Sequence, residues 1–163
     1  MMTMFCIGPG GYVAYEQKKA REQKAAVEII QKLGGRIEYD SSLRSRSRWQ
    51  RLLLGDDSFA NATGLDLSNT RVSDTDLAHV RHFSQLRWLA LGWTEVTDSG
   101  LARLVGLSEL VNLNIGETQV TDAGLVHVHR FPQLRVLTVL QTHVTDSGVH
   151  NLHKALPKLH INH

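Results

Sequence analysis

The apolar positions in the second half of the chain repeat every 24 residues. Each of four units opens with two apolar residues at alternate positions and closes with apolar residues at about every third position. The alternate spacing predicts a short strand with one buried face, and the wider spacing predicts a helical segment. The opening pairs are Leu65/Leu67, Leu89/Leu91, Leu113/Ile115 and Leu137/Val139.

Polar residues also recur at fixed places in the unit. A Ser/Thr-Asp dipeptide precedes each helical segment, so Thr97 is predicted to be an N-cap and Asp98 to lie in the positive first turn. A glycine such as Gly100 stands at the third helical position of three units, where neighbouring repeats would crowd. A threonine follows each apolar pair, and we expect these residues to form a hydrogen-bonded ladder beside the sheet: Thr70, Thr94, Thr118 and Thr142.

A single unit of this length cannot bury its own apolar residues, but stacked units form a parallel sheet over one continuous core. We expect the strands at about 64–67, 88–91, 112–115 and 136–139.

The repeated unit resembles the bacterial leucine-rich repeats of form LxLxxTxVTDxGLxxLxxLxxL, which are related to the repeats of F-box-type ubiquitin-ligase receptors. The resemblance covers about residues 65–160. It implies an α/β solenoid, with a parallel sheet on one face and helices on the other. It also implies a protein-interaction scaffold that binds its partner on the concave sheet face, and it carries over no catalytic residue.

The first part of the chain predicts a helix followed by a short strand. Residues 14–33 are predicted to form a helix that ends at Gly34-Gly35, and its apolar side consists of Ala26, Val27, Ile29, Ile30 and Leu33. We interpret residues 1–60 as an N-terminal segment and helical cap, and residues 61–163 as four repeats. The alternative is a basic amphipathic helix on a membrane, but several glutamates dilute its charge.

The composition limits the kinds of partner and the cellular locations that we expect. The net charge of +2 does not favour nucleic acid, although an arginine run at residues 44–51 is an alternative phosphate contact. A single cysteine, Cys6, gives no sign of an oxidising compartment, so we predict a cytoplasmic protein. The apolar residues 1–15 are too short and too interrupted to span a bilayer, and a truncated membrane anchor is the alternative.

The sequence offers no enzyme motif and no cofactor site. It lacks a glycine-rich phosphate loop, a nucleophile elbow and a pair of zinc-binding cysteines. Nine histidines are the one unusual feature, and His150 and His153 would share a helix face that can bind a metal. They fall at variable positions of the repeat, which is typical of solvated surface residues.

The strand positions between the buried leucines point to the open face of the sheet. Exposed tryptophan and leucine there indicate an interface, since tryptophan is enriched at binding hot spots. Gly92 and Gly116 are expected to leave a shallow trough. The alternative is that Trp93 folds over the sheet margin while Val136 and Leu140 pack under the chain end. The predicted partner-binding residues are Trp88, Trp93, Asn112, Asn114, Glu117, Val136, Thr138 and Leu140.

Other roles remain open at this point. Similar repeats serve as substrate receptors in ubiquitin ligation, which would require a second module that binds an adaptor. A membrane-tethered scaffold and a histidine-based metal site are the further alternatives.

Overall fold

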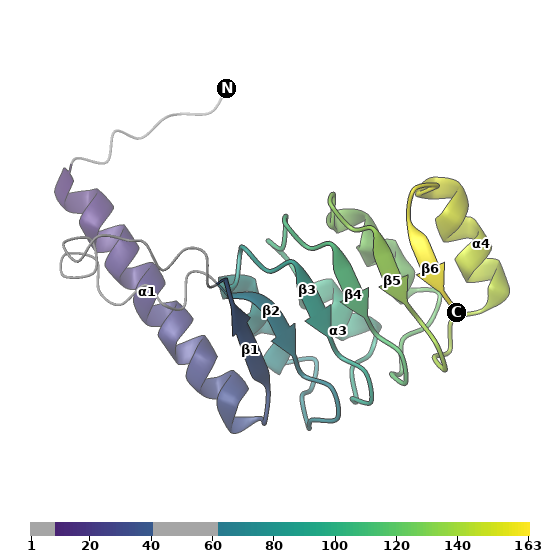
Figure 1. Ribbon diagram of the computed structural model, residues 1–163, viewed down its shortest axis with the longest axis horizontal. Helices are drawn as coiled ribbons and strands as arrows, with labels where there is room; N and C mark the ends of the chain where they lie inside the picture. The colour runs from purple at the N-terminus through teal and green to yellow at the C-terminus, as the bar shows by residue number, and fades with distance from the viewer. Residues whose placement is uncertain (1–8, 41–61) are drawn as a thin grey trace.

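A six-stranded sheet runs the length of the molecule (Figure 1). The computed structural model describes residues 9–40 and 62–163. The strands follow one another in chain order: β1 (Arg36–Tyr39), β2 (Ala62–Asp66), β3 (Trp88–Ala90), β4 (Asn112–Asn114), β5 (Val136–Thr138) and β6 (His160–Asn162). Neighbouring strands from β2 to β6 are parallel and in register, each residue facing one 24 positions later. The predicted parallel pairing of the four repeat strands is therefore confirmed.

One helical segment follows each repeat strand; the earlier ones lie behind the sheet in Figure 1, and α4 is seen beside β6 at the end of the stack. The segments alternate between 3₁₀ and α geometry: η3 (Asp76–His82), α3 (Asp98–Arg103), η4 (Gly124–Arg130) and α4 (Asp146–Ala155). The Thr97 hydroxyl accepts from the Ser99 N–H at 3.2 Å, and the Thr145 hydroxyl accepts from the Gly148 N–H at 3.1 Å. These bonds confirm the predicted N-cap role at Thr97 and Thr145, whereas the N-cap residues of η3 and η4 are Thr75 and Ala123, which make no side-chain cap.

The core lies between the strands and the helical segments. The first leucine of each apolar pair is at most 1% exposed, which confirms that these positions point inward. The same core continues into the first helix through Ala26, Val27 and Ile30. The chain thus has an α/β fold of leucine-rich-repeat type, in which each unit buries its apolar residues against its neighbours.

The helix α1 (Pro9–Lys32) begins earlier than residue 14, the predicted start. A proline suits the first turn of a helix because its fixed φ is helical and its missing N–H needs no partner. At the other end Gly34 has φ of +87°, and the Gly35 N–H donates to the Ile30 carbonyl at 2.9 Å. The predicted glycine stop is confirmed, and the chain turns directly into β1.

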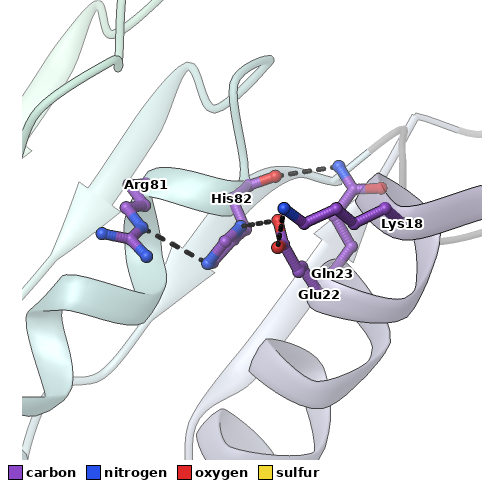
Figure 2. Close-up of polar contacts among 5 residues, drawn as sticks. All are labelled: Lys18, Glu22, Gln23, Arg81 and His82. Carbon is purple, nitrogen blue, oxygen red and sulfur yellow. Dashed lines mark hydrogen bonds and ion pairs between the residues drawn. The ribbon is translucent and has the colours of Figure 1, made fainter. Parts of the chain in front are cut away.

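Helix α1 is joined to η3 by polar contacts around His82 (Figure 2). Gln23 is buried, with 5% of its surface exposed, and its Nε2 donates to the His82 carbonyl at 2.8 Å. The Glu22 carboxylate lies 3.8 Å from His82 Nδ1, and Arg81 Nε donates to His82 Nε2 at 3.4 Å. Burial lowers the pKa of His82, the charge of Arg81 lowers it further, and Glu22 acts in the opposite direction.

The expected threonine ladder between repeats does not form. Each hydroxyl instead donates to a carbonyl three residues earlier in its own unit, for example from Thr94 to Leu91 at 2.6 Å. Because this hydrogen bond joins two groups only three residues apart, it closes the turn at the end of the strand. The other three hydrogen bonds run from Thr70 to Leu67, from Thr118 to Ile115 and from Thr142 to Val139.

Several predictions fall outside the described residues, namely those on Cys6, residues 1–8 and the arginine run at 44–51. The division of the chain at residue 60 stays a prediction for the same reason. No helix among the described residues combines the length and the apolar character needed to cross a membrane.

Candidate partner-binding surface

The open face of the sheet is hollowed over β3, β4 and β5. The hollow has a volume of about 210 Å³, and the buried side chains of Leu89 and Leu113 lie among its lining residues. Strand register places the outward positions in two rows across the sheet, because residues 24 positions apart face each other. Five of the eight predicted binding residues line this hollow: Trp88, Asn112, Asn114, Val136 and Thr138.

Trp88 forms a wall of the hollow but is not the free anchor that its position predicts. It is half-buried, and its indole N–H donates to the Glu38 carboxylate at 3.2 Å. The ring lies over Gly64, where an added Cβ would collide with it. The antiparallel pairing of β1 places Glu38 opposite Gly64, which explains why the indole turns toward the first strand.

The other three predicted residues, Trp93, Glu117 and Leu140, lie in the turns just beyond the strands. Trp93 is 67% exposed and Leu140 is 48% exposed. This exposure contradicts the alternative in which Trp93 folds over the sheet margin. The structure therefore brings five predicted residues together in the hollow and leaves these three in turns beyond the strand ends.

The turn that carries Trp93 has an unusual backbone. The same position of each repeat has a positive φ, between 55° and 60°, at Asn69, Trp93, Glu117 and Gln141. Asparagine tolerates this left-handed conformation, whereas a bulky residue is strained in it. Tryptophan thus occupies a position that Asn69 fills with less strain in the first unit. The left-handed turn was not predicted from the sequence, although Trp93 aligns with Asn69 of the first unit.

The trough predicted at Gly92 and Gly116 stays a prediction, and neither glycine is among the residues that line the hollow. A Cβ at Gly116 would lie 3.1 Å from the Leu140 carbonyl oxygen, and one at Gly92 would lie 3.4 Å from the Gly116 carbonyl oxygen. Successive turns therefore lie close to one another, although the same position of the first and fourth units is occupied by Ser68 and Leu140. Hydrogen bonds hold the turns together, for example from the Glu117 N–H to the Leu140 carbonyl at 2.9 Å.

The repeat aspartates connect neighbouring repeats in addition to lying at the predicted helix starts. The Asp98 carboxylate accepts from the N–H of Thr121 at 2.8 Å and from its hydroxyl at 2.7 Å, one repeat further on. Asp74 binds Thr97 and Asp122 binds Thr145 in the same way. These contacts, which we call the Asp–Thr bridges, join the repeats. In the sequence these bridges are indicated by a constant separation of 23 residues between each aspartate and the threonine that it binds.

A second hollow lies at the C-terminal end of the stack, between α4 and β6. It has a volume of about 410 Å³ and gathers four histidines: His150, His153, His160 and His163. Among the residues that the structure describes, no three His, Cys, Asp or Glu side chains are grouped so that they could hold a metal ion.

No known family profile matches the chain, and no curated protein compared with it does. Among solved structures, the chain is similar to an internalin from Listeria monocytogenes, which is a bacterial leucine-rich-repeat protein. The two are 20% identical with a TM-score of 0.52, and the match covers 99% of this chain. The chain spans 40% of the length of that internalin chain. This likeness supports the leucine-rich-repeat fold.

Proposed function

We propose that this chain is a non-enzymatic leucine-rich-repeat solenoid that binds a protein partner on the open face of its sheet. The observation that carries the proposal is the hollow over β3, β4 and β5, with exposed Trp93 and Leu140 in the turns beyond the strands. The likeness to an internalin supports the fold on which the proposal depends.

The surface has the mixed chemistry of a protein interface. Trp93 and Leu140 expose large apolar side chains that a partner would remove from water. Between them, Asn112 and Asn114 expose carboxamides on the central strand, and the Oδ1 of Asn114 is already bonded to the Gly116 N–H at 2.9 Å. A carboxamide both donates and accepts, so these side chains suit the backbone of an extended polypeptide.

The proposed solenoid is capped by α1 and β1. β1 pairs with β2 in the antiparallel direction, and α1 contributes Ala26, Val27 and Ile30 to the core. Both elements thus cover the first repeat, as the end of a repeat stack requires. The substrate-receptor role, membrane tethering and a cytoplasmic location stay predictions from the sequence.

The decisive variant of the proposed surface is Trp93→Asn with Leu140→Ser. Asn69 occupies the equivalent turn with nearly the same φ, so Trp93→Asn is expected to raise the free energy of unfolding by about 1 kcal/mol. Proteins captured from the native host by the wild-type chain should be lost by this variant. The capture is measured by quantitative mass spectrometry, and stability is measured by urea unfolding.

Val126→Ser is the matched control because Val126 is 62% exposed on η4, on the other side of the sheet. It removes an exposed apolar side chain without touching the proposed surface, so capture should be unchanged. Equal capture by the folded Trp93/Leu140 variant and by the wild type would refute the proposed surface.

A further inference from the structure

The charged residues of the repeats are segregated by their place in the unit. The stretch from the end of each strand to the start of the helical segment contains eight acidic residues and one basic residue, Arg71. The stretch from the end of each helical segment to the next strand contains seven basic residues and one acidic residue, Glu109. The seven are Arg81, Arg87, Arg103, Arg130, Arg135, Lys154 and Lys158.

These two stretches lie at opposite edges of the stack because the strands are parallel (Figure 1). We call them the acidic edge (residues 66–76, 90–100, 114–124 and 138–148) and the basic edge (residues 79–87, 103–111, 127–135 and 151–159). Backbone bonds of 2.8 Å from Val111 N to Arg87 O and from Arg135 N to Val111 O place successive strand starts side by side. Arg87 and Arg135 are two strands apart, or about 10 Å along one row.

The charges at the two edges differ in what they do for the fold. At the acidic edge, the carboxylates of Asp74, Asp98 and Asp122 are half-buried and form the Asp–Thr bridges. At the basic edge all seven Lys and Arg side chains are exposed, and no ion pair among the described residues includes any of them. These three aspartates therefore help to pack the repeats together. Most of the basic side chains have no such structural role.

The helix dipole does not account for the basic row either. It favours cations in the last turn of a helix and fades beyond that turn. Arg87, Arg135 and Lys158 lie outside the helical segments, in the connections to the strands. Two others do bond within the fold, since Arg130 Nη1 donates to the Ala102 carbonyl at 3.0 Å and Arg81 contacts His82.

We propose that the basic edge binds an acidic, extended segment of a protein partner. Arginine presents a planar fork of donors that pairs with a carboxylate through two hydrogen bonds. A row of such groups along one edge matches a chain of carboxylates by charge and by shape. The row ends at a hollow of about 490 Å³, where Arg87 lies beside Trp88 and Val111 and also near the acidic Asp40. The proposal therefore rests on the exposed Lys and Arg side chains along the row and not on this hollow.

Other polyanions fit the edge less well. Phe83 and Phe131 of the edge are buried, and Trp88 at its end is half-buried with its indole N–H bonded to Glu38, so the row lacks a series of open rings on which nucleic-acid bases can stack. Val105 is the large apolar residue exposed within the described edge, which is too little to anchor the edge in a membrane. The basic edge is distinct from the surface around Trp93 and Leu140, so either proposal can fail without the other.

The test measures binding of a fluorescein-labelled oligoglutamate to the full chain by fluorescence anisotropy. We expect binding that weakens from about 50 to about 300 mM salt, because exposed charges are screened. The variant Arg103→Gln/Arg135→Gln/Lys158→Gln removes three basic side chains that have no bond within the described fold. It should melt at the wild-type temperature and bind the peptide roughly tenfold more weakly or worse.

The matched control is Lys19→Gln/Arg21→Gln/Lys24→Gln, which removes the same charge from exposed positions of α1. It should bind the peptide as the wild type does. Equal losses in both variants would show attraction to net charge alone and would overturn the proposal, as would undiminished binding by the basic-edge variant. The class of partner is wrong if a sulfated oligosaccharide, an oligonucleotide or phosphatidylglycerol vesicles bind the basic edge more tightly than the peptide does.

Discussion

The two edges of the repeat stack carry opposite charges and contribute differently to the fold. At the acidic edge, the carboxylates of Asp74, Asp98 and Asp122 each accept two hydrogen bonds from the next repeat. At the basic edge the side chains of Arg103, Arg135 and Lys158 are exposed and make no bond within the described fold. The charged residues of this repeat stack therefore have two separate roles. The aspartates connect neighbouring units, whereas these three basic residues lie on the surface.

The glycine of the helical segment belongs to the acidic edge as well. The position of its missing side chain is filled by the aspartate of the preceding repeat, at Gly100, Gly124 and Gly148. The first unit has Asp76 at this position, where its carboxylate accepts from the Ser73 N–H at 2.9 Å. In the described chain no earlier repeat supplies an aspartate that would occupy this space. A side chain therefore fits at Asp76, whereas the later units have glycine at the same position.

The largest expected effect is that of Gly100→Ala. The new Cβ would overlap the Asp74 carboxylate and lie 2.9 Å from Val96 Cγ1, so the Asp–Thr bridge has to shift. Overpacking of this kind costs about 3 kcal/mol, measured as the free energy of unfolding in urea. Gly106→Ala is the control, since no atom lies within 4 Å of its Cβ. Its φ of +79° alone should cost about 1 kcal/mol, and equal costs at both glycines would contradict the crowding argument.

Asp98→Ala is expected to have the next largest effect. It leaves the N–H and hydroxyl of Thr121 without their partner, which should cost about 2 kcal/mol. Asp146→Ala is the matched substitution, because Asp146 has the same place in the last described repeat and no bond to a following threonine. Only its helix-dipole contribution should be lost, a few tenths of a kcal/mol. The same loss of stability at both positions would show that helix starts, and not bridges between repeats, explain the aspartates.

Much of this fold was predictable because its pattern is local and repeated. The inward leucines, the parallel strands and the N-caps at Thr97 and Thr145 follow from the repeated spacing, and the structure confirms them. The Asp–Thr bridges and the left-handed turns were missed because each depends on how one unit meets the next. The threonine ladder was wrong because a carbonyl three residues earlier lies nearer to each hydroxyl than the next repeat does.

The candidate binding surface was predictable only as a set of outward positions. Strand alternation places Asn112, Asn114, Val136 and Thr138 on the open face, where they line the hollow. The orientation of Trp88 was not predictable, since it depends on Glu38 in a strand that pairs in the opposite direction. The segregation of charge cannot be seen in one unit. It becomes clear only when the residues of the acidic edge and of the basic edge are counted over all four units.

The smallest expected effect concerns His82, the half-buried imidazole where the basic edge meets α1. Burial and the nearby Arg81 lower its pKa in the folded chain, so the unfolded chain binds a proton more readily. The stabilising contribution of neutral His82 is therefore complete above its ordinary value of 6.5 and is lost as the pH falls from there toward the folded pKa. Wild type should lose more stability between about pH 7.5 and about pH 5.5 than His82→Gln does, as measured by urea unfolding at each pH. An unchanged pH dependence in the variant would show that His82 does not account for the loss. A wild type that is less sensitive to pH than the variant would contradict the lowered pKa of His82.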